Sequence, residues 1–182
     1  MYFSKIKKHR LSMSAAIHTN IITPLIEKLY SPMSQLEQFQ FDKESSSYHA
    51  ASFVTEEQVI LFRKANITPK KIGQFVTLWK RNITSGETEP YTTKDQVDLV
   101  TIFIKNQDQY GLFIFSTAIL REMKILTHDN IMGKRGFRIY APWDIPENKQ
   151  AIKTKEWQIK YFEYLAPDLI DNNSLLSIAT YA

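Results

Sequence analysis

The sequence contains no cysteine and only five glycines among its 182 residues. The lack of cysteine excludes a disulfide framework, a thiol nucleophile and any zinc site that uses cysteine ligands. No apolar run approaches the roughly 20 residues that a membrane-spanning helix requires. The basic N-terminus also lacks the apolar segment of a signal peptide. We therefore expect a cytoplasmic protein that makes no membrane contact.

The sequence motifs of the common enzyme classes are missing as well. There is no phosphate-binding glycine loop, no nucleophile elbow and no glycine fingerprint for dinucleotides. Metal-ligand spacing is absent from the four histidines, which are His9, His18, His49 and His128. We accordingly expect no resident metal ion and no cofactor.

The composition that remains is typical of a packed globular domain. Hydrophobic residues make up 43% of the chain and aromatic residues 13%, and this length supports one domain with a sizeable core rather than two. We place a single domain at residues 14–167. Residues 1–13 are predicted to form a disordered basic tail, and residues 168–182 a loosely ordered tail.

Positive and negative charges are segregated along the chain, although the net charge is only +4. The acids lie largely in 37–57 and 87–98, whereas residues 1–26 contain no acid. The segment 63–81 also lacks acids and carries six cations, Arg63, Lys64, Lys70, Lys71, Lys80 and Arg81. A third basic cluster consists of Lys134, Arg135 and Arg138. Segregation of this kind indicates an anionic partner.

The hydrophobic pattern predicts an α/β (α+β) domain with a single mixed β-sheet flanked by helices. We predict helices within 14–30, 116–126 and 148–165. An antiparallel hairpin is predicted at 47–54 and 58–64, and further strands at 71–81, 97–105, 110–115 and 135–143. Residues 34–47 are expected to be a polar connection, and residues 80–98 the longest loop.

The segment 71–81 alternates with the period of a β-strand, so Phe75, Thr77 and Trp79 share one face. Two interpretations stay open at this stage. The strand is either half-buried with its lysines solvated, or it forms a surface for an anionic polymer, on which an exposed aromatic ring would stack against bases. Six cations without one acid favour the second interpretation.

Two other basic features extend this hypothesis. Glycines flank Lys134 and Arg135, so the backbone there can approach a ligand closely, and Arg138 can contact a phosphate through two hydrogen bonds. Lys153 belongs to a lysine stripe on the last predicted helix, a pattern that is also typical of the solvated side of an amphipathic helix.

Asp98 is the strongest candidate for a catalytic carboxylate, because it stands at the start of a nearly continuous apolar strand. A carboxylate there could bind Mg²⁺. A metal-dependent nuclease would also need a second carboxylate and a lysine on the adjoining strand, and the sequence YGLFIFS offers neither. The alternative is that Asp98 caps a strand end or pairs with a lysine.

Several segments together resemble the MepB family of bacterial proteins: FRKANITPKKIGQFVTLWKR, DLVTIFI, YGLFIF, GKRGFRIYAPWD and QAIKTKEWQIKYFEYL. The resemblance covers about residues 44–165. It implies a restriction-endonuclease-like fold with a capacity to bind DNA, and a link to a multidrug resistance operon. The family's Pro-Lys after the second Phe is replaced here by Ser116 and Thr117, which argues against hydrolysis.

We predict a protein that grips the phosphate backbone of nucleic acid, independently of sequence and with a preference for single strands. DNA is favoured over RNA, and the protein is expected to be a monomer or a weak dimer. The predicted contacts converge in one trough and comprise Arg63, Lys64, Lys70, Lys71, Trp79, Lys80, Arg81, Lys134, Arg135, Arg138 and Lys153. The alternatives are a Mg²⁺-dependent nuclease centred on Asp98 and a regulatory protein-interaction module.

Overall fold

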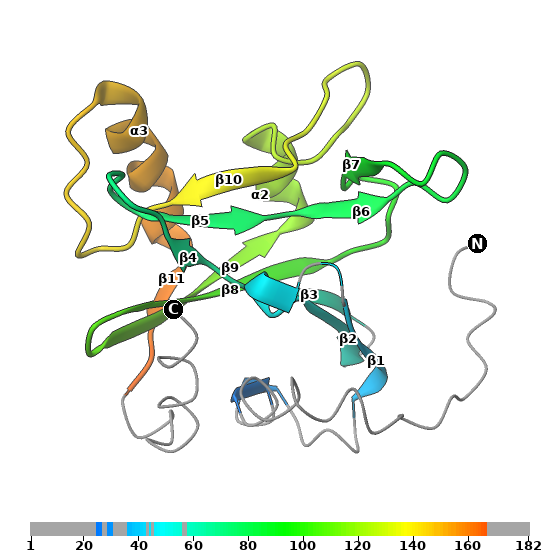
Figure 1. Cartoon of the computed structure of the whole chain (residues 1–182), viewed down its shortest axis with the longest axis horizontal. Helices are drawn as coiled ribbons and strands as arrows, with labels where there is room; N and C mark the ends of the chain where they lie inside the picture. Colours follow the sequence, from blue (N-terminus) through cyan, green and yellow to red (C-terminus); the bar gives the residue numbers. More distant parts are fainter. Residues whose placement is uncertain are drawn as a thin grey trace.

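A mixed six-stranded sheet forms the base of the molecule (Figure 1). The computed structural model describes residues 25, 26, 29, 30 and 36–166, without 43, 45, 56 and 57. The strand order is β1-β2-β3-β8-β9-β11. These strands are β1 (Glu37–Phe41), β2 (Ala51–Thr55), β3 (Gln58–Lys64), β8 (Leu99–Asn106), β9 (Gln109–Ser116) and β11 (Phe162–Tyr164). Only β3 and β8 pair in parallel; the other neighbours are antiparallel.

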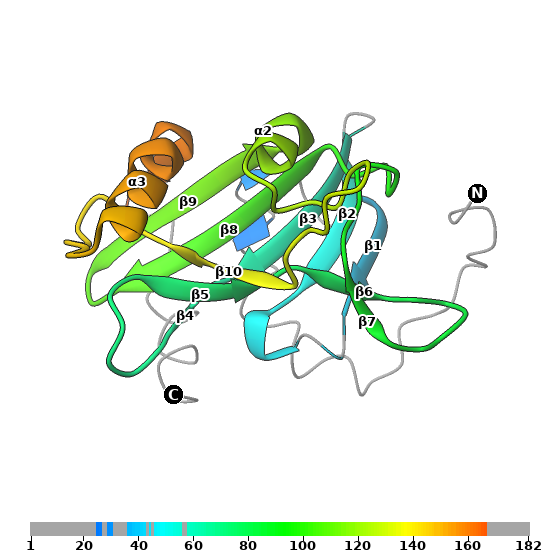
Figure 2. The ribbon, with the colours of Figure 1, turned by 90° about the horizontal axis from the view of Figure 1, so that it is seen from above.

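The parallel pair requires a long crossover from β3 to β8, and the crossover builds a second layer above the main sheet (Figures 1 and 2). A three-stranded sheet has the order β10-β5-β4. A separate two-stranded ribbon pairs β6 with β7. The bounds are β4 (Asn66–Ile67), β5 (Gln74–Thr77), β6 (Trp79–Arg81), β7 (Thr88–Pro90) and β10 (Gly136–Ile139).

Helices are few in the described part of the chain. Ser116 begins α2 (Thr117–Glu122) and Asn148 begins α3 (Lys149–Gln158), each by accepting a hydrogen bond from a backbone N–H of the first turn. Two short 3₁₀ turns complete the elements, η3 (Ser46–Tyr48) and η4 (Ile159–Tyr161). No helix of the described residues is long and apolar enough to cross a membrane.

Two cores lie on the two faces of the main sheet. The core beneath the second layer contains Leu61, Ile102 and Phe115, together with Val76 and Leu78 from the crossover. The opposite core contains Phe62 and Phe103 and is covered by residues from both ends of the described chain, Leu25, Ile26, Leu36 and Leu165. The central strands β3 and β8 therefore bury both faces, which explains why their sequences are almost continuously apolar.

Most of the predicted strands are confirmed. The hairpin of β2 and β3 forms with Ala51 opposite Phe62, β8 is central, and β9 follows it through a tight turn. In the segment 71–81 burial alternates as the strand period predicts: Val76 and Leu78 are buried, while Phe75 and Thr77 are half-buried. The predicted helix within 14–30 lies mostly outside the described residues, as do the two predicted tails.

Four predictions need correction. The single sheet is three sheets, because the chain turns away from the main sheet after β3 and must form its own pairs above it. The predicted polar connection 34–47 contains β1, which completes the sheet edge beside β2. The predicted loop 80–98 contains β7, which pairs with β6. The α+β class and a mixed main sheet are confirmed, and the structure shows that this sheet has six strands.

The fourth correction concerns the last predicted helix. We expected it to reach residue 165, but it ends at Gln158, and β11 follows and pairs with β9. Gly111 on β9 explains the change, because the ring of Phe162 covers it: a Cβ at this position would lie 2.2 Å from Phe162 Cζ. The glycine leaves room for an aromatic ring across the strands, and this tertiary contact outweighs the helical period.

Candidate nucleic-acid interface

Six of the predicted cations line three separate hollows rather than one trough. Lys71 lines a small hollow beside Trp143. Lys134 and Arg138 line a groove between β10 and α3. A third hollow, the largest, is lined by Trp79 and by three of the predicted cations, Arg63, Lys80 and Arg81. Tertiary structure thus divides what the sequence presents as one basic segment.

The largest hollow, which we name the Arg63 cleft, has a volume of about 820 Å³. One side of the cleft is the outer part of the main sheet, with Gln40, Ser52 and Leu61. The other side is the β6–β7 ribbon together with residues from 91–97. Four cations and four acids line it, the cations being Arg63, Lys80, Arg81 and Lys94 and the acids Asp42, Glu44, Glu89 and Asp95. The lining is therefore balanced in charge and does not favour a polyanion.

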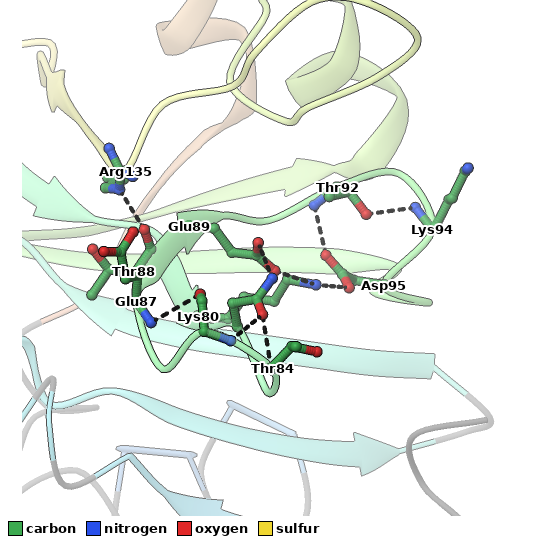
Figure 3. Close-up of polar contacts among 11 residues, drawn as sticks. Lys80, Thr84, Glu87, Thr88, Glu89, Thr92, Lys94, Asp95 and Arg135 are labelled. Carbon is green, nitrogen blue, oxygen red and sulfur yellow. Dashed lines mark hydrogen bonds and ion pairs between the residues drawn. The ribbon is translucent and has the colours of Figure 1, made fainter.

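Two of the four cations of the Arg63 cleft are already neutralised by neighbours. Lys80 forms ion pairs with Asp95 and, at 3.4 Å, with Glu89 (Figure 3). Burial alone would lower the pKa of Lys80, but these two carboxylates outweigh it and raise the pKa above its ordinary value. Arg81 donates from Nε to Glu44 at 2.6 Å. The charges of Lys80 and Arg81 are thus used in ion pairs within the fold.

Arg63 is buried, with only 2% of its surface exposed. Its Nη1 donates to the carbonyl oxygens of Phe62 and Ala51, at 2.8 and 3.3 Å. Lys64 points to the opposite face of the strand, where burial and then the charge of Lys105 lower its pKa. Neither residue presents its charge on an open surface, and we leave both out of the proposed interface.

The groove between β10 and α3, which we name the basic groove, has a different character. Its volume is about 420 Å³. Within the part of the chain that the structure describes, its lining contains no aspartate or glutamate and consists of Met123, Ile125, Lys134, Gly136, Phe137, Arg138, Tyr140, Asn148, Gln150, Ala151, Thr154, Trp157 and Gln158. Two cations, several amide and hydroxyl groups and three aromatic rings, with no acid among the described lining residues, form a surface that suits an anion.

The wall formed by β10 is a free strand edge of the three-stranded sheet. Leu78 N donates to Arg135 O at 2.8 Å, so the odd-numbered residues of β10 pair with β5 and the even-numbered ones direct their N–H and C=O groups toward α3. There is no room for a side chain at Gly136 in this wall, because a Cβ there would lie 2.7 Å from the Phe75 ring and 2.8 Å from Val76 O. The N–H groups of Gly136 and Arg138 therefore face the groove.

Gln158 joins α3 to this edge. The side chain is completely buried; its Oε1 accepts from Tyr140 N at 2.9 Å, and its Nε2 donates to Arg138 O at 3.0 Å. The side-chain amide thus makes with Arg138 and Tyr140 the two hydrogen bonds that a neighbouring strand would make. It links the β10 wall of the groove to the α3 wall. Sequence reasoning missed Gln158, because a glutamine on a polar helix gives no signal of burial.

Arg138 connects the basic groove to the turn before β5. Its guanidinium donates to Thr68 Oγ1 at 2.7 Å, to Gly73 O at 2.9 Å and to Ile72 O at 3.2 Å. The turn that carries the exposed Lys70 and Lys71 is thereby held beside β10. Gly73 adopts a positive φ of 77° and lies against the Tyr140 ring, so only glycine fits there.

Five of the predicted contacts are exposed and have no carboxylate partner among the described residues: Lys70, Lys71, Lys134, Arg135 and Lys153. Lys153 lies on α3 beside Trp157, which lines the basic groove. Arg135 is exposed but donates from Nε to Thr88 O at 2.8 Å, which anchors the segment before β10 to the β6–β7 ribbon (Figure 3).

Asp98 has a structural role. Its Oδ2 accepts from Val59 N at 2.8 Å and its own N–H donates to Val59 O at 2.9 Å. These bonds join β3 and β8 where the parallel pair begins, which confirms the prediction that Asp98 caps a strand end. Within the described ranges, no three His, Asp or Glu side chains lie close enough to hold a metal ion.

Comparison with known proteins places this chain in a family. No curated protein matches it. A solved structure, "Crystal Structure of MepB", is similar with a TM-score of 0.69 and 32% identity, and the match covers 77% of this chain and 93% of that one. The model of the MepB-like family matches residues 42–164, close to the range in which the sequence resemblance was seen. The chain therefore belongs to the MepB-like family.

Proposed function

We propose that this protein binds the phosphate backbone of nucleic acid along the basic groove. The carrying observation is the lining of this groove, which contains Lys134 and Arg138 and, among the described residues, no carboxylate. Lys134 and Arg138 are four residues apart, at most about 13 Å at ordinary strand rise, since β10 begins only at Gly136. This length corresponds to roughly four phosphates along one strand of a duplex.

Three further features of the surface support this proposal. Backbone N–H groups of β10 face the basic groove and are natural donors to phosphate oxygens. Trp157 lines the same groove, and a ring in this position supports stacking with an unpaired base and hence a preference for single strands. Lys153 on α3, and Lys70 and Lys71 on the turn held by Arg138, extend the positive surface at the ends of the groove.

The interaction is expected to be independent of base sequence. The lining offers charge, backbone donors and an aromatic face, and it has no recognition helix of the kind that enters the major groove. DNA is the favoured partner on the basis of the family resemblance. The alternative is a regulatory module that binds an acidic protein partner through the same surface. In that case the protein would not retain nucleic acid at physiological salt.

The first prediction concerns the salt dependence of binding. Fluorescence anisotropy of labelled single- and double-stranded oligonucleotides should show affinity falling steeply as salt rises. For a single strand, log K should fall by about 0.7 per phosphate neutralised for each ten-fold rise in salt concentration. Lys134→Glu and Lys153→Glu should each flatten this slope, because each removes one phosphate contact. Both lysines are exposed and unpaired within the described structure, so folding should be preserved.

Lys94→Glu is the matched control. Lys94 is exposed and lies on the Arg63 cleft, outside the basic groove, and the substitution changes the net charge by the same amount. If Lys94→Glu and Lys134→Glu flatten the slope equally, the contact surface is not the basic groove. If the unmodified protein retains no oligonucleotide at physiological salt, the nucleic-acid function itself is wrong.

A restriction-endonuclease-like fold with Mg²⁺-dependent cleavage centred on Asp98 remains the alternative proposal. The hydrogen bonds of Asp98 to Val59 favour binding without hydrolysis, as does the sequence YGLFIFS of the adjoining strand, which offers neither a second carboxylate nor a lysine. Incubation with supercoiled plasmid and Mg²⁺ distinguishes the two. Nicking that disappears in Asp98→Ala would replace the binding proposal with the nuclease.

A further inference from the structure

Arg63 stands out among the buried groups that the proposed interface does not use. Its side chain is 98% buried and lines the Arg63 cleft, and no carboxylate of the described residues lies within ion-pair distance of it. Two carbonyl oxygens accept from its Nη1. Carbonyl dipoles offset part of the desolvation of a buried charge, but a full positive charge is stabilised best by a negative one.

Two other cations of the Arg63 cleft are paired within the fold, whereas Lys94 and Asp42, which also line it, have no ion-pair partner among the described residues. Lys80 pairs with Asp95 and Glu89, and Arg81 pairs with Glu44. Figure 3 shows the side chain of Lys94 extending away from the Lys80 network. Among the described residues, Arg63 is therefore the buried cation of this cleft that has no ion-pair partner.

We propose that the Arg63 cleft binds a small organic molecule that carries one carboxylate on an aromatic body. The guanidinium fork of arginine matches a carboxylate through two parallel hydrogen bonds. Trp79 and Tyr91 line the same cleft and supply the faces against which an aromatic ring would pack. The cavity volume of about 820 Å³ lies within the usual range for sites that enclose small molecules.

A single negative charge fits this cleft better than several. Four carboxylates line it, so a second charge on the ligand, and all the more a polyanion, would meet repulsion. Burial, its largest influence, raises the pKa of Tyr91, although the charge and hydrogen bond of Arg63 lower it. The Tyr91 hydroxyl thus keeps its proton at neutral pH and can donate a second hydrogen bond to the bound carboxylate.

The experiment uses the full-length protein with benzoate, phenylacetate and indole-3-acetate as probes, each beside its neutral amide. Binding is measured by calorimetry and by the NMR signal of the Trp79 indole N–H. At least one carboxylate should bind and shift this signal at millimolar concentration. Its neutral amide should bind more weakly by a factor of about ten or more, because the charge-assisted pair is lost. Arg63→Lys, which keeps the charge but loses the fork, should weaken carboxylate binding by a similar factor.

Lys94→Gln is the matched control, because Lys94 is an exposed cation of the cleft mouth. It should change the affinity by less than about two-fold. If Arg63→Lys fails to fold, the comparison of carboxylate and amide on the unmodified protein decides. Equal affinity for carboxylate and amide, tighter binding of phenyl phosphate than of benzoate, or no binding of any probe would overturn the proposal. The basic groove is a different site, so these outcomes leave the nucleic-acid test untouched.

Discussion

Residues of one charge sign have three different fates in this protein. Arg63 is enclosed, Arg138 is held by the oxygens of the neighbouring turn, and Lys134 is exposed without an acidic partner. The sequence shows that these cations are concentrated in a few segments, but it cannot show which of them meet an acid. That depends on contacts such as Lys80 with Asp95, which lie 15 positions apart and meet only after the β6–β7 ribbon has formed.

A second residue-scale feature is Asp144, which lies in the loop before α3. Its Oδ2 accepts from Ala141 N at 2.7 Å. Burial raises the pKa of Asp144 above its ordinary value of 3.8, although this hydrogen bond and the charges of Lys155 and Arg138 lower it. The folded protein therefore holds the Asp144 proton more tightly than the unfolded chain does. Ionisation of this carboxyl favours unfolding as pH rises from 3.8 through the raised pKa.

The prediction is that Asp144→Asn gains stability relative to the unmodified protein as pH rises through that window. The asparagine carries no charge, and its side-chain oxygen can still accept from Ala141 N. Urea unfolding of both proteins at a series of pH values measures the difference. The gain should be smallest near pH 3.8 and largest once Asp144 is ionised in the folded state. A difference that is constant or that shrinks with rising pH would contradict this assignment.

At the scale of elements, periodicity predicted strands better than the end of the last helix. Alternation within 71–81 separated Val76 and Leu78 from the face of Phe75, Thr77 and Trp79 but left open which face is buried. The structure buries Val76 and Leu78, and the register of a strand between a core and a surface then places the other face outward. The aromatic residues of 157–165 also repeat at helical spacing. Trp157 and Tyr161 indeed pack on Phe115, but Phe162 covers Gly111 and the chain becomes β11.

The element-scale prediction concerns the joint between α3 and β10. Gln158→Met keeps the length of the side chain but leaves the Tyr140 N–H and the Arg138 C=O buried without their partner. Two such groups should cost about 2–4 kcal/mol of the free energy of unfolding, measured in urea. The same substitution at the exposed Gln150 of α3 is the control and should cost less than about 0.5 kcal/mol. Equal losses at both positions would show that Gln158 does not hold the joint.

At the scale of the whole molecule, stability is concentrated in the middle of the main sheet. β8 is paired on both sides, with β3 and β9, and Ile102 and Ile104 are completely buried. The β6–β7 ribbon has two short strands and exposed residues in its turn. Regions with few buried apolar contacts open more readily than the core.

Native-state hydrogen exchange should reflect this difference. The amides of Ile102 and Ile104 should exchange only through global unfolding, because both neighbours of β8 must separate first. The amides of the β6–β7 ribbon should exchange through local opening, with a weaker dependence on denaturant. Exchange of the ribbon at the same rate as β8 would show that the second layer and the main sheet unfold as one unit.

The sequence by itself determined the α+β class, most of the strands, the family and the segments in which positive charge is concentrated. These properties depend on local periodicity and composition, which adjacent residues already contain. Only the tertiary structure decided that the cations separate into three hollows, that Gln158 joins α3 to β10, and that Arg63 is buried. The physical reason is that each of these outcomes depends on contacts between residues distant in sequence, and the crossover between the parallel strands β3 and β8 brings those residues together.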